Sequence, residues 1–358
     1  MINLHKEICT GCNENILAGH TYLECTKCLS IIHKKCFNRS NIKLINSSYV
    51  CINCCRSITN AYNPFREFTE SHINKDLDDK FYEDDFLETF DTIRKASNIL
   101  DNCHFHKLSL AHKHYESKTD FSTLFYNIDG NFTNFDTFAA ELTVQKTNYS
   151  VIALAETNVG KDKGDLFRLE KYNHFYNDKM PNKSKGTGVC LYIHSSLNAT
   201  VIEKLCTVTP NLESLFVSIN VGTIKINVGV LYRSPNGDPA LFLDELLHLN
   251  SLLPKKSMSL LLGDFNFDLL KRNNTETQDF ENTFLSLGYF PLISRPTHSI
   301  NNQQSSCIDN ILTNSIDTVT MTGVIEDFNS HHRPIFSRFN VPIGSNTCLL
   351  YTSPSPRD

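Results

Sequence analysis

No stretch of this 358-residue sequence approaches the roughly 18 to 20 consecutive apolar residues that a membrane-spanning helix needs. The first residues, Met1 to Lys6, lack an apolar core and a small-residue cleavage site, so we expect no secretory signal. A protein that is not secreted folds in a reducing compartment, where thirteen cysteines indicate metal sites before disulfides. These absences exclude a secreted disulfide scaffold and a membrane partner from our expectations.

The sequence also lacks an excess of basic charge, since its formal net charge is −5. Residues 66–91 hold ten Asp/Glu and three Lys/Arg, a balance of −7, which leaves −5 + 7 = +2 for the remainder. Because one acidic segment carries the whole excess, the total does not exclude a nucleic-acid partner.

Composition divides the chain into segments. We expect a Cys-rich domain over 1–58, an acidic linker with a helix over 59–120, and a larger domain over 121–339. Residues 340–347 would begin a second linker. Residues 348–358 resemble the translation of a sequencing-library adapter, so we expect them to be foreign and the natural chain to continue past Thr347.

The largest segment alternates short apolar runs with helical patterns. Seven runs read as strands: Thr123–Ile128, Val151–Ala155, Gly188–Ile193, Ser214–Ile219, Ile224–Leu231, Met258–Leu262 and Cys307–Leu312. Phe135, Phe138, Ala139 and Leu142 form one helical face, and Leu241, Phe242, Leu246 and Leu249 form another, which Asp238-Pro239 would open. Many strands with few helices predict a mixed α/β domain of two packed sheets flanked by helices. In the linker, Phe81 to Ile99 predict a helix, and we expect the histidines after it, at 104, 106, 112 and 114, to be a solvated tail.

The Cys-rich segment carries four ligand pairs, each with a two-residue gap. They are Cys9/Cys12, Cys25/Cys28, His33/Cys36 and Cys51/Cys54. Zinc takes four nitrogen or sulfur ligands in a tetrahedron, and eight ligands make two closed sites with no open position for water. We therefore predict two structural Zn²⁺ ions, which supply much of the folding free energy of so short a segment.

The ligand order, four cysteines, one histidine and three cysteines, resembles the plant homeodomain (PHD) finger. The resemblance implies cross-braced pairing: Cys9, Cys12, His33 and Cys36 at one zinc, and Cys25, Cys28, Cys51 and Cys54 at the other. It also implies docking on a histone tail, nucleic acid or a chromatin protein. The sequence has no tryptophan, and Ile31 stands where the family's methyl-lysine cage usually has one, which argues against methyl-lysine binding.

A second set of polar residues lies at the ends of the predicted strands of 121–339. Phosphodiester hydrolysis needs a hard cation, a base beside a water and donors to the phosphate oxygens. Asn127, Asp129 and Glu156 can hold Mg²⁺ (or Mn²⁺), and Asp309 can orient His332. Asp264 and Asn266 can position the water and a phosphate oxygen, and Tyr232 can donate to the phosphate.

The order of these residues over 121–339 resembles the endonuclease/exonuclease/phosphatase superfamily, and within it the endonuclease of non-LTR retrotransposons. The resemblance implies a four-layer α/β sandwich and Mg²⁺-dependent nicking of target DNA in the nucleus, with a reverse transcriptase downstream. By the match, Asn127, Asp129 and Glu156 are metal-side residues, and Tyr232, Asp264, Asn266, Asp309 and His332 are catalytic.

One departure leaves an alternative open. The family's final Ser-Asp-His is Ser330-His331-His332 here, and imidazole is a poorer Mg²⁺ ligand than carboxylate. A decayed or domesticated copy that only binds chromatin or nucleic acid is therefore the second hypothesis, and a phosphatase of the same superfamily is the third. Residues 161–185 hold seven Lys/Arg against four Asp/Glu. The candidate contacts to the phosphate backbone are Lys183 and Lys185 in this segment and Arg233 outside it. A solvated loop explains the lysines equally well.

Overall fold

The structure is a computed structural model that describes residues 61–66, 84–108 and 120–341, apart from residues 131, 147, 182, 184, 223, 255–256, 301–303 and 329. It also describes four short strands near the N-terminus, β1 (Glu7–Ile8), β2 (Asn15–Ile16), β3 (Tyr22–Glu24) and β4 (Ile31–His33). In this part of the chain, no helix combines the length and apolarity needed to cross a membrane.

The predicted zinc finger lies almost wholly outside the described residues. All seven of its cysteine ligands do so, and of His33 only the backbone is described, at the end of β4. The described strands form two antiparallel pairs, β1 with β2 and β3 with β4. In the sequence, Cys9 and Cys12 fall between the strands of the first pair, and Cys25 and Cys28 between those of the second. The two-zinc finger stays a prediction.

The first large sheet has seven strands in the order β10-β12-β13-β14-β18-β15, with β11 also paired to β12. The strands are β10 (Asn198–Val201), β11 (Thr207–Val208), β12 (Leu212–Val221), β13 (Ile224–Arg233), β14 (Met258–Asp264), β15 (Phe290–Pro291) and β18 (Asp309–Thr313). The pair β13–β14 is parallel, and the remaining pairs are antiparallel.

The second sheet also has seven strands, in the order β5-β19-β20-β6-β7-β9-β8. They are β5 (His104–His106), β6 (Asp120–Asn127), β7 (Val151–Ala155), β8 (Tyr172–Tyr176), β9 (Val189–His194), β19 (Val319–Ile325) and β20 (Ile335–Asn340). Strand β6 runs parallel to β7, and β5 runs parallel to β19. A separate hairpin, β16 (His298–Ile300) with β17 (Gln304–Ser306), completes the strands of this region.

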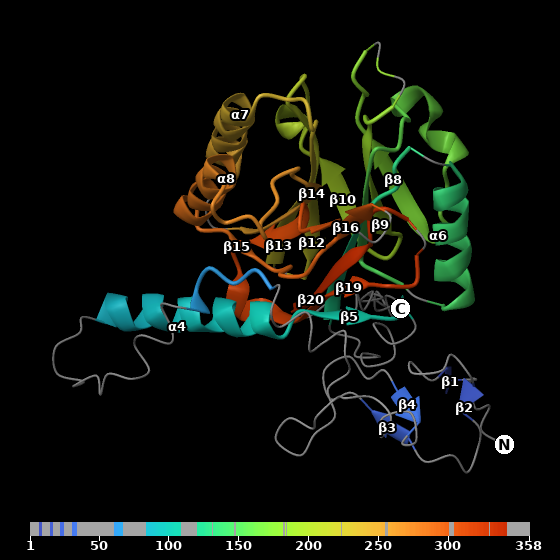
Figure 1. Ribbon diagram of the computed structural model, residues 1–358. Coiled ribbons are helices and arrows are strands. Elements are labelled where there is room, and N and C mark those ends of the chain that lie inside the picture. Colours follow the sequence, from blue (N-terminus) through green and yellow to red (C-terminus); the bar gives the residue numbers. More distant parts are fainter. Residues whose placement is uncertain are drawn as a thin grey trace, which may run out of the picture.

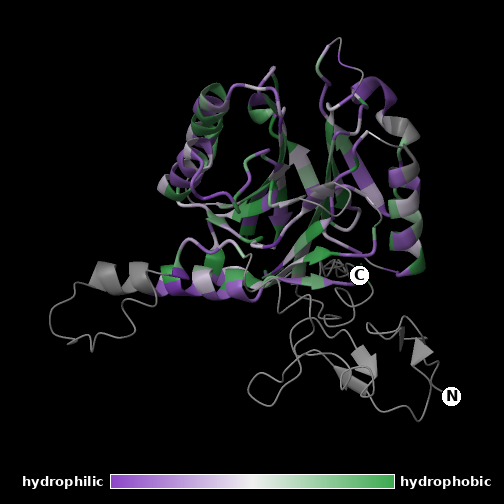
Figure 2. Cartoon of the chain, in the orientation of Figure 1, coloured by the Kyte–Doolittle hydropathy of each residue, from purple (hydrophilic) through white to green (hydrophobic). Residues whose placement is uncertain are grey.

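The core is arranged in layers, as the alternation along β7 shows. Val151, Ala153 and Ala155 belong to a buried cluster shared with the first sheet, whereas Ile152 and Leu154 pack in a second cluster with α6. Because successive strand residues point to opposite faces, the second sheet is covered on both sides. Figure 2 shows the central strands largely green and the peripheral loops largely purple. Each of the seven runs predicted as strands overlaps an observed strand.

Helices flank the two sheets, on their outer faces and along one end (Figure 1). They are α4 (Asp84–Asp101), α6 (Phe132–Val144), α7 (Pro239–Leu252) and α8 (Thr275–Ser286), with short 3-10 turns at Lys161–Leu166, Glu203–Leu205 and Ile316–Thr318. The predicted start of α7 is confirmed, because the Asp238 side chain accepts a hydrogen bond from the backbone N–H of Leu241 and Pro239 occupies the first turn. In Figure 1, α7 and α8 lie on one side of the molecule and α6 on the other.

Parts of the expected linker belong to the folded domain. Tyr62, Ala96 and Leu100 are buried in the main core, and α4 overlaps the predicted helix. The expectation of a solvated tail is wrong for His104 and His106, which are buried because β5 pairs with β19 at the sheet edge. His112 and His114 lie outside the described residues.

Candidate active site

The two sheets bring their polar strand ends to one place. Asn127 ends β6, Asp264 ends β14, and Asp309 begins β18 directly opposite Asp264 in the register. The amide of Asn127 donates to a carboxylate oxygen of Asp264 over 2.9 Å. This bond joins the second sheet to the first, so the site lies where the two sheets meet.

Tight turns explain why the Asn127-x-Asp129 and Asp264-x-Asn266 sequences fold as they do. In each, the first side chain accepts a hydrogen bond from the backbone N–H two residues on, at 2.9 Å and 3.0 Å. Asp129 and Asn266 take positive φ values of 52° and 53°, which short polar side chains tolerate better than others. Glu156, directly after β7, also has a positive φ of 53°. Such backbone strain concentrates at functional sites.

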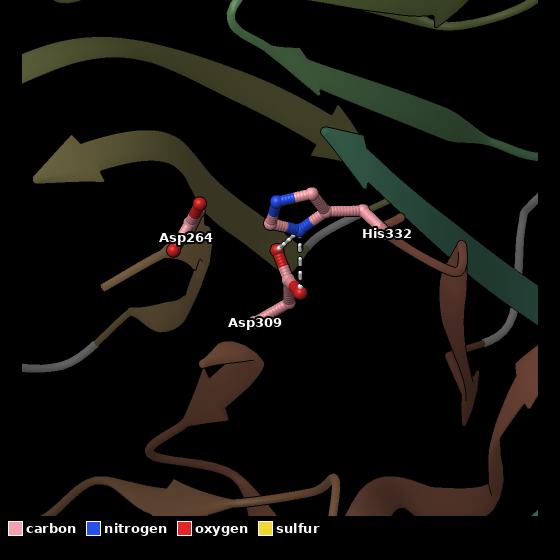
Figure 3. A group of neighbouring side chains, drawn as sticks. All are labelled: Asp264, Asp309 and His332. Atoms are coloured by element: carbon pink, nitrogen blue, oxygen red, sulfur yellow. Dashed lines mark hydrogen bonds and ion pairs between the residues drawn. The ribbon is translucent and has the colours of Figure 1, made fainter. Parts of the chain in front are cut away.

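A buried Asp–His pair forms the centre of the site (Figure 3). The His332 Nδ1 lies 3.0 Å and 3.2 Å from the two carboxylate oxygens of Asp309. The second ring nitrogen of His332 is not bonded to Asp309. In Figure 3 it lies on the side of the ring that faces Asp264. The pair therefore fixes the ring and turns its second nitrogen toward Asp264.

The ionisation of this centre follows from burial and charge. Burial alone would lower the pKa of His332, but the adjacent Asp309 carboxylate raises the pKa to about 9. Burial, followed by repulsion from Asp309, raises the pKa of Asp264. The site thus combines a readily charged imidazole with a carboxyl group that holds its proton more tightly than usual, the ingredients of acid–base chemistry.

The hairpin β16–β17 and the residue before it hold the Asp–His pair in place. The Thr297 hydroxyl oxygen accepts from the backbone N–H of Asp309 at 3.1 Å, and the Thr297 carbonyl accepts from that of Arg333 at 2.7 Å. His298 pairs with His332 as an isolated bridge, and their rings lie 4.6 Å apart. Neither residue was predicted, because their role depends on chain pairing that no local pattern reveals.

Glu156 and Tyr232 meet on the other side of Asn127. The Asn127 amide donates to Glu156 at 2.9 Å, and the Tyr232 hydroxyl is hydrogen-bonded to Glu156. Burial, and then the charges of Glu156 and Asp264, raise the pKa of Tyr232, so this phenol keeps its proton and remains a donor. The expected grouping of Asn127, Glu156, Asp264 and Tyr232 is therefore present as one connected network.

Glu213, a buried carboxylate beside this network, was not predicted from the sequence. It accepts from the Thr187 hydroxyl at 2.5 Å and from the Gly188 N–H at 2.6 Å, and burial raises its pKa. It thereby holds the loop at Gly186, where an added Cβ would lie 3.4 Å from the Tyr232 hydroxyl. The sequence feature that could have indicated Glu213 was a charged residue within the mostly apolar segment Leu212 to Phe216.

Three other predicted residues are placed differently from the central network. Asp129 turns to His331, with 3.6 Å between carboxylate oxygen and Nδ1, and both side chains are more than half exposed. Asn266 donates its amide to the Arg233 carbonyl at 2.7 Å. Arg233 is only 4% exposed and donates to the carbonyls of Asn266 and Gly237, so its guanidinium is engaged within the protein.

The two candidate lysines lie at the edge of the same region. Lys183 donates to the Ser234 hydroxyl at 3.1 Å, and Lys185 is exposed. Lys183 thus reaches the residue that follows β13, and Lys185 is open to solvent.

The carboxylates of the site fit a divalent cation. Ligand atoms of Asp264, Asp309 and His332 lie within 4.8 Å of one another, but a charged imidazole does not bind a metal. The candidate ligands are therefore Glu156, which is joined to Asp264 through the Asn127 amide, and Asp129, which is bonded to the same Asn127 side chain. Carboxylate oxygens suit a hard cation, which would neutralise phosphate charge when bound.

Comparison with known proteins agrees with this geometry. The sequence signature of the Endonuclease/Exonuclease/phosphatase family matches residues 124–337. The chain belongs to this family. That stretch begins in β6 and ends in β20, so it contains every residue of the network. No curated protein has a matching sequence.

Solved structures share the fold. The endonuclease domain of TRAS1, a telomere-specific non-LTR retrotransposon, is 17% identical with a TM-score of 0.51, over 62% of this chain and 99% of that one. AP endonuclease LMAP from Leishmania major is 12% identical with a TM-score of 0.50, over 64% and 90%. D. rerio TDP2 complexed with single strand DNA product is 16% identical with a TM-score of 0.47, over 62% and 100%. At these identities the likeness shows the fold alone.

Proposed function

We propose that this protein is an endonuclease that nicks DNA by divalent-cation-dependent hydrolysis of a phosphodiester bond. The observation that carries the proposal is the buried Asp309–His332 pair facing Asp264 at the junction of the sheets. Family membership supports a hydrolytic enzyme, and the fold likeness to a retrotransposon endonuclease and an AP endonuclease favours DNA as the substrate.

Each residue of the network has a proposed part in the reaction. Asp264 accepts the proton of the attacking water, for which its raised pKa is suited. The charged His332, held by Asp309, and the Tyr232 hydroxyl donate to phosphate oxygens as negative charge develops there. Glu156, Asp129 and Asn127 would hold the cation, which supplies further neutralisation of that charge when bound.

We further propose that the enzyme serves a non-LTR retrotransposon in the nucleus. The resemblance of the residue order to such endonucleases and the TRAS1 fold likeness support this assignment. The two-zinc finger would dock the nuclease on a histone tail, nucleic acid or a chromatin protein, and a reverse transcriptase encoded downstream would use the nick.

Nicking of supercoiled plasmid DNA in Mg²⁺ or Mn²⁺ tests the proposal. We expect wild type to convert supercoiled to open-circular DNA, and Asp264→Ala and His332→Ala to lose at least about a hundredfold in rate, the usual worth of a positioned acid or base. Asp244→Ala and His248→Ala, which remove exposed side chains on α7, are matched controls and should keep the rate.

Two outcomes would contradict the proposal. If neither cation supports nicking by the wild type, or if Asp264→Ala nicks as fast as the wild type, the network is not a nuclease site. If the wild type does not nick DNA but His331→Asp does, the decayed copy would be supported instead. That substitution restores the carboxylate that the resemblance implies at this position. Release of phosphate from inositol phosphates, without DNA nicking, would favour the phosphatase.

A further inference from the structure

An exposed imidazole and carboxylate stand together at the edge of the active site. The Nδ1 of His331 lies 3.6 Å from a carboxylate oxygen of Asp129, and the two side chains are 56% and 53% exposed. A charge-assisted hydrogen bond between such groups spans about 2.7 to 2.9 Å, so this pair is too far apart for one. Two ligands of one ion, each about 2.1 Å from it, lie about 3.0 Å apart in an octahedron and about 3.4 Å apart in a tetrahedron. The exposed pair would therefore have to close by only about half an ångström to share a cation.

The backbone fixes both partners, so their proximity does not depend on loose loops. The His331 carbonyl accepts from the backbone N–H of Ser299 at 2.9 Å, which ties it to the hairpin β16–β17. The Asp129 N–H donates to the Asn127 side chain at 2.9 Å, and its backbone holds a positive φ. A site whose ligands are already in place loses less entropy when it binds an ion.

The pair is also open to solvent and next to the catalytic network. The same Asn127 side chain that accepts from Asp129 donates to Glu156 and Asp264. The His298 ring lies 6.4 Å from the His331 ring. The Nδ1 of His298 is bonded to the Ser306 hydroxyl, so the other ring nitrogen of His298 is a further candidate metal ligand near the pair. A hydrated cation can therefore reach Asp129 and His331 and still border the proposed site of cleavage.

We propose that Asp129 and His331 are joint ligands of the divalent cation of the proposed nuclease, and that the imidazole makes the site prefer Mn²⁺, Co²⁺ or Zn²⁺ to Mg²⁺. The role of the cation in cleavage rests on the proposed function, whereas its binding by Asp129 and His331 does not. Mg²⁺ takes oxygen ligands almost exclusively, whereas imidazole suits the borderline transition metals.

Mn²⁺ binding to the full, zinc-loaded chain tests the assignment by electron paramagnetic resonance. We expect imidazole-nitrogen modulation of the bound Mn²⁺ spin echo in the wild type. His331→Ala should weaken that modulation and raise the Mn²⁺ dissociation constant by at least about tenfold, the scale on which loss of a metal-site partner acts. His331→Asp should bind Mg²⁺ more tightly than the wild type. His248→Ala, which removes an exposed histidine on α7, is the matched control and should change nothing.

Nicking rates separate this inference from the proposed function. The ratio of the rate in Mn²⁺ to the rate in Mg²⁺ should fall at least tenfold in His331→Asp. Unchanged Mn²⁺ affinity and spin-echo modulation in His331→Ala would overturn the inference, even if the wild type nicks DNA. His331-dependent Mn²⁺ binding without nicking in any cation would instead uphold the metal site and overturn the nuclease.

Discussion

Asn127 joins three residues of the candidate site through one side chain. Its amide donates to Glu156 and Asp264, and its carbonyl oxygen accepts from the Asp129 N–H. Both donors and one of its two acceptor positions are thus used, in a residue that is almost fully buried. A side chain with both donors and an acceptor is required here, because two of its neighbours are carboxylates and the third is a backbone donor.

We predict that Asn127→Asp lowers the nicking rate at saturating cation by at least about a hundredfold, because a third buried carboxylate would repel Glu156 and Asp264 instead of bonding to them. Stability should also fall by about 1 to 3 kcal/mol, the usual cost of buried groups left without partners. Plasmid nicking and urea unfolding measure the two effects.

Asn227→Asp is the control for that prediction. Asn227 is also fully buried, but it lies near the start of β13 and donates to the Ser257 hydroxyl at 2.6 Å. It should lose stability without a matching loss of nicking at temperatures where it stays folded. Equal losses of nicking in both variants would show that the effect at Asn127 is only structural.

At the scale of elements, the Glu213 carboxylate anchors the loop Gly186–Gly188, beside the backbone hydrogen bonds that Thr157 and Asn158 donate to it. Glu213→Ala should lower kcat at least about tenfold and stability by about 1 to 3 kcal/mol, because the Thr187 hydroxyl and the Gly188 N–H lose their acceptor and the loop moves from Tyr232. Glu213→Gln can keep both hydrogen bonds, since the threonine hydroxyl also accepts, and should recover most of kcat.

Glu245→Ala is the matched control for the loop. Its carboxylate also accepts from a threonine hydroxyl, that of Thr209 at 2.8 Å, but it lies on α7 outside the loop. It should lose stability and retain kcat. If Glu213→Ala kept kcat, or if Glu213→Gln failed to recover it while folding normally, the positioning role would be refuted.

Elements with a strong local pattern could be predicted from the sequence. β7 was predicted to the residue, because Val151–Ala155 is apolar throughout and buried on both faces. β5 could not be predicted, since the polar His104–His106 becomes a strand only by pairing with β19, more than 200 residues along the chain. α8 carries few apolar residues, mainly Phe280 and Phe284, and its helical pattern was too sparse to recognise.

The residues of the candidate site also fall into those that the sequence could predict and those that it could not. Residues that end strands in a recognisable order, such as Asn127 and Asp264, were named and lie together. Thr297 and Glu213 act by accepting hydrogen bonds from segments distant in sequence, and no local pattern reports such contacts. Arg233 was named as a candidate phosphate contact, and the structure places its guanidinium over the Phe267 ring, a contact that no local pattern reports.

For the whole molecule, the buried charges predict pH-dependent stability of the metal-free protein. The pKa of His332 rises from its ordinary 6.5 to about 9 in the fold, so its stabilising contribution is full below pH 6.5 and is lost as the pH rises through 9. The raised pKa of Asp264 acts in the same direction. Melting temperature in a chelator should therefore fall over this range.

His332→Gln gives the comparison for the pH prediction. Without a titrating imidazole, the fall in melting temperature above pH 6.5 should become shallower. A wild-type melting temperature that stayed constant or rose from pH 6.5 to pH 9 would contradict the charged Asp309–His332 pair.

Zinc content tests the N-terminal prediction in the intact protein. We expect two zinc ions per chain by elemental analysis, and loss of one with Cys9→Ser, because a tetrahedral site rarely survives the loss of a thiolate. Cys55→Ser, next to the predicted ligand Cys54, is the control and should keep both ions. A metal-free wild type, or loss of zinc from the control alone, would contradict the assignment of ligands.

The pairing of β5 with β19 has a consequence for how the chain assembles. Because β5 closes an edge of the second sheet, a molecule truncated past His106 would present β19 as a row of unpaired backbone groups. Such an edge invites strand exchange with a second molecule. The segment before the family-matched region thus protects the family's fold from self-association, as well as connecting it to the predicted finger.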